Sequence, residues 1–69
     1  MNYYSARVVM AILNNNEPSE IITLARIAKE NGSDEIFILE LAGAVNSEQY
    51  PTLIKMAKES LILRLTGVE

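Results

Sequence analysis

The chain has no cysteine, no histidine and no tryptophan among its 69 residues. Without cysteine it forms no disulfide scaffold, and without cysteine and histidine it lacks the side chains of the usual zinc and haem sites. The same absences remove thiol nucleophiles and imidazole bases. We therefore expect a protein that is not an enzyme and that uses neither a metal ion nor a cofactor.

Glycine and proline are also scarce, with three and two residues, which excludes collagen-like and low-complexity sequence. Long hydrophobic runs are missing too. The longest nearly apolar stretch covers residues 36–45 and contains Glu40, whereas a membrane span needs about 20 apolar residues. Residues 8–13 are too short for the hydrophobic core of a signal peptide, and no small-residue cleavage site follows them. These features predict a cytoplasmic protein with no membrane association.

What remains is a slightly acidic chain rich in apolar residues. Nine acidic residues face six basic ones, the formal net charge is −3, and 49% of the residues are hydrophobic. This combination excludes intrinsic disorder and predicts one globular domain over residues 1–69. A domain this small buries only about 60% of the surface of its unfolded chain. Because disulfides and metals are absent, self-association is the expected source of further stability.

Three breaks rich in asparagine, glycine, serine or proline separate four segments with helical periodicity, at residues 3–13, 18–30, 34–45 and 51–66. The second segment has the clearest pattern, because Ile21, Leu24, Ala25 and Ala28 follow the i, i+3, i+4, i+7 spacing. Pro18 suits a first helical turn. Gly32 and Gly67 are placed as stops of the second and fourth helices. The fold class expected is all-α, a compact bundle of three to four short helices.

The third segment leaves one alternative open. Ser33 is a good N-cap, and the acidic residues Asp34 and Glu35 suit a first turn. However, the apolar run 36–39 also has a high β propensity, so a strand competes with the helix. As a helix, four consecutive apolar residues would face nearly all directions and require burial all round.

The third and fourth helices together carry more apolar surface than one bundle can cover. In the fourth, the apolar residues near position 64 occupy more than half of the helix circumference. We expect this excess to form a homo-oligomer interface, most simply a two-fold dimer. Arg64 fits such an interface, since its stem packs while its head pairs with a carboxylate. The predicted interface residues are Phe37, Leu61, Ile62, Leu63, Arg64 and Leu65.

Two octapeptides resemble each other at an offset of 29 residues. Residues 23–30 and 52–59 share five of eight positions, and the other three are apolar or basic in both. A duplicated helical unit would produce this similarity. Two unrelated amphipathic helices drawn from the same residue types would produce it as well, and both interpretations stay open.

Positive charge gathers on the same two helices. Arg26 and Lys29 share a face of one, and Lys55 and Lys58 share a face of the other, so side-by-side helices would frame an anionic ligand. The alternative is a solvated face with i, i+4 ion pairs. Tyrosine and arginine near the N-terminus suit a binding surface. The candidate ligand-binding or partner-binding residues are Tyr3, Tyr4, Arg7, Arg26, Lys29, Lys55 and Lys58.

The spacing around Gly32 resembles that of a helix-turn-helix motif, with Ala28 before it and Ile38 and Leu41 after it. A recognition helix presents polar and basic side chains to DNA. The recognition helix of such a motif would be the predicted helix over residues 34–45. Its outward positions are acidic or apolar, which opposes binding to nucleic acid.

The expected function is therefore that of a non-catalytic interaction protein, a small regulator, adaptor or inhibitor that acts as a homo-oligomer. Small inhibitors encoded by phages or other mobile elements often have this composition. Its partners would be a second copy of itself and another protein. One alternative is an oligomer that sequesters an anionic metabolite or nucleotide between subunits. A weaker one is a DNA-binding regulator.

Overall fold

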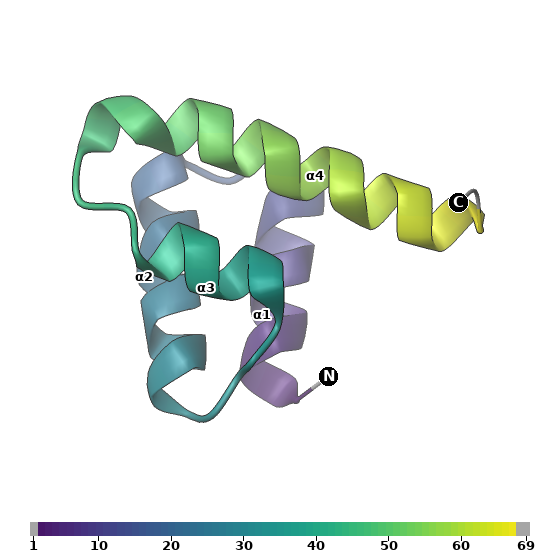
Figure 1. Ribbon diagram of the computed structural model, residues 1–69, viewed down its shortest axis with the longest axis horizontal. Coiled ribbons are helices and arrows are strands. Elements are labelled where there is room, and N and C mark those ends of the chain that lie inside the picture. The colour runs from purple at the N-terminus through teal and green to yellow at the C-terminus, as the bar shows by residue number, and fades with distance from the viewer. Residues whose placement is uncertain (1, 68–69) are drawn as a thin grey trace.

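The computed structural model describes residues 2–67, which form four α-helices and one short 3-10 helix (Figure 1). In chain order these are α1 (Tyr3–Leu13), α2 (Pro18–Glu30), α3 (Ile36–Ala42), η1 (Ser47–Gln49) and α4 (Tyr50–Thr66). No strand occurs in this range, which confirms the all-α prediction. The segment for which the sequence allowed either a helix or a strand forms the helix α3.

The first two helices form an antiparallel hairpin with the predicted bounds (Figure 1). The side chain of Asn2 caps α1 by accepting a hydrogen bond from the backbone N–H of Ser5 at 2.8 Å. Asn15 turns the chain with a φ of 55°, a conformation that asparagine adopts more readily than most residues. Pro18 then opens α2, where its missing N–H costs no helical hydrogen bond.

The turn between α2 and α3 differs from the prediction. Gly32 has a φ of 91° and ends α2 as expected. Ser33, however, does not cap α3, because its buried hydroxyl lies 2.6 Å from the hydroxyl of Ser5. Glu35 is extended, so α3 begins at Ile36 and ends at Ala42, shorter at both ends than the predicted 34–45.

The core lies around α2, which packs most extensively against α1 and α3. Its apolar members come from all four α-helices and the loop that follows α3. They are Val8, Ala11, Ile12, Ile21, Ile22, Ala25, Ala28, Phe37, Ile38, Leu41, Ala44, Ala57 and Leu61.

α3 is buried on one side only, which corrects the expectation that it would be covered all round. Phe37, Ile38 and Leu41 face the core. Ile36 remains 69% exposed, and Leu39 on the neighbouring side is also exposed. The reason is that α2 and α4 cover the inner side of α3, and no further element among residues 2–67 covers its outer side.

α4 crosses the ends of α1 and α2, and its C-terminal turns extend beyond the other helices (Figure 1). It begins one residue before Pro51 and ends at Gly67, whose φ of 70° confirms the predicted glycine stop. Neither this helix nor any other within residues 2–67 has the length and apolar character needed to cross a membrane.

Candidate functional site

An open groove of about 250 Å³ lies between α3 and α4. Three residues of the first turns of α3 form one wall. The α4 wall consists of residues spaced three or four apart, which therefore share one side of the helix. The lining residues are Ile36, Phe37, Glu40, Leu53, Met56, Ala57, Ser60 and Arg64. The groove thus combines an apolar lining with one carboxylate and one guanidinium.

Exposed apolar side chains continue from the groove along the projecting end of α4. Met56 is more than half exposed, and Leu63, two helical turns further on, is 53% exposed. Single exposed apolar residues are ordinary, whereas contiguous ones mark interaction surfaces. We call the surface formed by Ile36, Glu40, Met56, Ser60, Leu63 and Arg64 the α3–α4 face.

The structure divides the six residues predicted for an oligomer interface into two groups. Phe37 and Leu61 belong to the core of the single chain and leave little surface for a second copy. Ile62, Leu63 and Leu65 are exposed on the projecting end of α4, with Leu65 at 73%.

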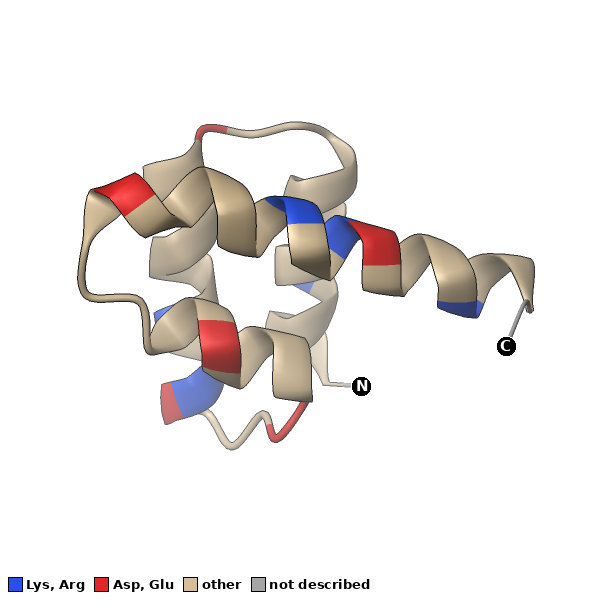
Figure 2. Ribbon diagram, turned by 45° about the horizontal axis from the view of Figure 1, so that its top comes forward, with Lys and Arg blue, Asp and Glu red and all other residues tan. Residues whose placement is uncertain are grey.

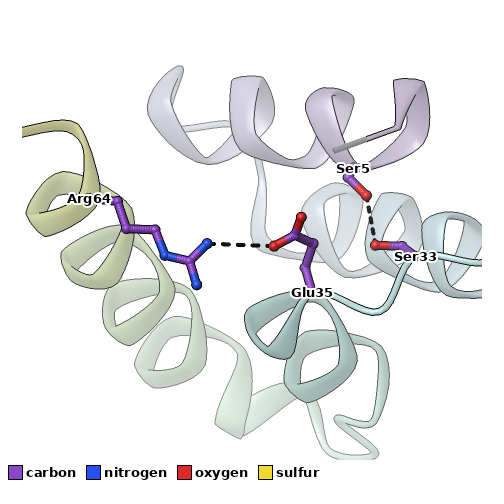
Figure 3. Close-up of polar contacts among 4 residues, drawn as sticks. All are labelled: Ser5, Ser33, Glu35 and Arg64. Carbon is purple, nitrogen blue, oxygen red and sulfur yellow. Dashed lines mark hydrogen bonds and ion pairs between the residues drawn. The ribbon is translucent and has the colours of Figure 1, made fainter.

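Arg64, the sixth, forms the ion pair that joins α4 to the start of α3 (Figure 3). A guanidinium nitrogen lies 3.5 Å from a carboxylate oxygen of Glu35. The pairing of an arginine head with a carboxylate was expected, but within one chain it fixes α3 against α4. Because Arg64 is 57% exposed, its guanidinium can also reach groups outside the chain.

The four basic residues predicted to frame an anionic ligand do not converge on one site. Arg26 donates a 2.7 Å hydrogen bond to the carbonyl of Ala44 and a longer one to the carbonyl of Ala42, in the chain that leaves α3. Lys58 instead donates to the side-chain oxygen of Asn15 at 2.9 Å, in the α1–α2 turn.

Lys29 and Lys55 are exposed, and the basic positions of α2 and α4 lie on different parts of the fold (Figure 2). Two of the four side chains thus hold loops of their own chain. This arrangement removes the main support for an anionic ligand framed by the two helices.

The N-terminal candidates form a separate cluster on α1. The rings of Tyr3 and Tyr4 meet edge to face with centroids 5.4 Å apart, and the guanidinium carbon of Arg7 lies 5.9 Å from the centre of the Tyr3 ring. Such a cation–π contact pre-orders an exposed arginine. Tyr3 and Arg7 line a shallow groove between α1 and α2 that also contains Met10 and Glu20.

Sequence reasoning missed the hydroxyl pair of Ser5 and Ser33, which joins α1 to the α2–α3 turn (Figure 3). Both serines are buried, and neither hydroxyl has a side-chain base as a hydrogen-bond partner in the described residues. The pair satisfies two buried polar groups, and nothing around it activates a nucleophile. No signal in the sequence pairs residues 28 positions apart.

Ile36, Glu40, Met56 and Ser60 were not among the predicted site residues, although the spacing contained a signal for Met56. Together with Leu53 and Leu63, Met56 forms a second apolar stripe of α4. The sequence contained no signal for Glu40. Which residues of α4 lie opposite Glu40 depends on the path of the chain between α3 and α4.

The described residues contain no group of three or more acidic side chains close enough to hold a metal ion. The outward side of α3, the second helix of the helix-turn-helix pattern, presents Ile36, Leu39 and Glu40. None of these side chains donates a hydrogen bond to a base edge or a phosphate.

No protein-family model matches this chain, and no curated protein or solved structure is significantly similar to it.

Proposed function

We propose that this protein is a non-catalytic interaction protein, a small regulator, adaptor or inhibitor, that acts as an oligomer and binds through its α3–α4 face. The observation that carries the proposal is the apolar groove between α3 and α4, which continues into the uncovered C-terminal turns of α4. A helix laid into such a groove is a common mode of protein recognition.

The composition of the face supports a protein partner. Its centre is apolar, with Ile36, Met56 and Leu63 exposed, while Glu40 and Arg64 supply charge of both signs. Specific interfaces combine an apolar centre with polar groups that fix the orientation of the partner. A site for a single anion would instead gather cations, and the basic residues here are dispersed.

The chemistry available elsewhere supports a function without catalysis. The chain has no histidine or cysteine. The buried serine pair lacks a base, and no three acidic residues in the described part of the chain lie close enough together to hold a metal ion.

Site-specific photo-cross-linking in living cells tests the proposal. A photoreactive amino acid is placed at position 63 in one variant and at position 27 in the control. Ile27 is an exposed apolar residue like Leu63, but it lies on α2, outside the α3–α4 face and outside the groove lined by Tyr3 and Arg7. We expect a discrete adduct, with a second copy or another protein, from position 63 only. Equal labelling from both positions, or no discrete adduct from position 63, would refute the proposal.

A further inference from the structure

We infer that the occupant of the α3–α4 face is a second copy of this chain, packed with its α4 antiparallel to the first and related to it by a two-fold axis near Ser60. The inference rests on the proposed function and names the partner of the same site. Three observations carry it: the spacing of residues along α4, the charges beside the groove, and the exposed apolar area.

The spacing along α4 is that of a helix–helix seam. Leu53, Met56, Ser60 and Leu63 follow one another at intervals of three, four and three residues, the alternation found in coiled coils. Leu53 is half-buried beside α3, whereas Met56 and Leu63 are exposed. Ser60 between them is small and lets a second helix approach closely. The seam begins beside α3 and continues to the C-terminal turns of α4, which project beyond the other helices (Figure 1).

An antiparallel arrangement centred between Glu59 and Ser60 places Met56 of one copy opposite Leu63 of the other, in two equivalent contacts. Each copy then covers Met56 and Leu63, the exposed apolar side chains on this side of its partner's α4. In a parallel arrangement Met56 would face Met56, and Leu63 would face Leu63.

The charges of the face complement each other in the antiparallel arrangement. The ion pair between Arg64 and Glu35 shows that the start of α3 lies beside the C-terminal end of α4. Glu40, one turn further along α3, lines the groove near Leu53 and Met56. Arg64 of the second copy comes to the level of position 55, between Leu53 and Met56, where its long side chain reaches Glu40 across the groove. Two symmetric ion pairs of this kind form per dimer.

The exposed apolar side chains supply an area that a second copy can bury. Ile36 is 69% exposed, Met56 55% and Leu63 53%, and a two-fold dimer covers each of them once on either copy. A small area of this kind suits a dimer that dissociates on dilution.

Disulfide trapping tests the arrangement, because the chain contains no cysteine of its own. Met56→Cys and Leu63→Cys chains are mixed and oxidised. We expect the mixed disulfide to form in preference to either homodisulfide, since like positions of the two copies lie about 10 Å apart along the helices, beyond the reach of about 7 Å between Cα atoms. Ser60→Cys should pair with itself, and Lys55→Cys, exposed on another side of α4, serves as the control.

A charge exchange tests the ion pairs without a cross-link. Glu40→Arg chains and Arg64→Glu chains should each remain monomeric in sedimentation, because each homodimer contains two like-charge contacts. Their mixture should dimerise, because both contacts become opposite in charge. Glu30→Arg, at the end of α2, should dimerise like the native chain, and circular dichroism confirms that all variants fold.

The outcomes separate this inference from the proposed function. Homodisulfides at positions 56 and 63, without a mixed disulfide, would overturn the antiparallel arrangement. A native chain that stays monomeric up to millimolar concentration would overturn the second copy as occupant. In that case a cellular adduct at position 63 with a different protein would still uphold the binding surface. Loss of that adduct as well would remove the proposed function.

Discussion

α2 and α4 contain the two similar octapeptides, yet the fold uses the two helices differently. In both, the shared alanine, Ala28 or Ala57, faces the core, and the basic residue two positions before it is exposed. α2 then packs between α1 and α3 over its length, while α4 crosses the bundle and leaves its last turns uncovered. A similar pattern therefore specifies a helix and its inward side, and the neighbouring elements decide how much of the helix is covered.

The largest contrast is expected from the same truncation in both helices. Ile22→Ala removes a side chain of α2 that is 1% exposed, and Ile62→Ala removes one of α4 that is 44% exposed. We expect the first to lower the free energy of unfolding by about 2–5 kcal/mol, because it leaves a cavity. The second should change it by less than about 0.5 kcal/mol. Denaturant unfolding at low protein concentration measures both, and comparable losses would contradict the comparison.

A smaller loss is expected from the polar link of the closely packed region. Ser5→Ala leaves the buried hydroxyl of Ser33 without its partner at 2.6 Å, at a cost of about 1–3 kcal/mol. The Ser5→Ala/Ser33→Ala double variant should be no less stable than Ser5→Ala, since no unpaired hydroxyl remains. Additive losses in a double-mutant cycle would show that the two hydroxyls do not act together.

Alanine substitutions of the equivalent basic residues Arg26 and Lys55 should change the free energy of unfolding by still smaller amounts. Arg26→Ala removes the hydrogen bonds to the carbonyls of Ala44 and Ala42, and we expect a loss of about 1–1.5 kcal/mol. Lys55→Ala, at the corresponding exposed position of α4, should stay within about 0.5 kcal/mol of the native chain. Thermal unfolding of the two variants side by side gives the difference. Equal midpoints would mean that Arg26 does not stabilise the loop.

The smallest effect is expected for the exposed link between α3 and α4. Arg64→Ala breaks the 3.5 Å ion pair with Glu35, and we expect the monomer to lose at most about 1 kcal/mol, because solvent screens the pair. Amide hydrogen exchange should accelerate in the last turns of α4 and remain unchanged in α2. Added salt should reduce the difference between variant and native chain. A loss as large as that of Ser5→Ala would contradict the solvent-exposed character of this link.

Local patterns were enough to predict α1, α2 and the end of α4. Pro18 at one helix start and Gly32 and Gly67 beyond two helix ends are signals that act within a few residues. The start of α3 could not be predicted, because Ser33 bonds to Ser5 across the core instead of capping its own helix. Tertiary contacts of this kind override a local preference without leaving a mark in the neighbouring sequence.

The candidate site could be predicted only in part, because it too depends on tertiary contacts. The apolar excess of α3 and α4 indicated a binding surface, and Leu63 and Leu65 are exposed as an interface requires. Phe37 and Leu61, equally apolar, lie in the core. Hydrophobicity alone does not show whether an apolar residue lies in the core or on the surface, because that depends on where α4 crosses the bundle.

The roles of Arg26 and Lys58 could not be predicted either. Their hydrogen bonds go to loops that are distant in the sequence.

The length of α4 has a mechanical consequence. Its 17 residues make a rod about 25 Å long, so a tilt of about 10° at its N-terminal end moves the other end by about 4 Å. The exposed ion pair of Arg64 with Glu35 is the contact near that far end, and a tilt of this size changes the width of the groove between α3 and α4.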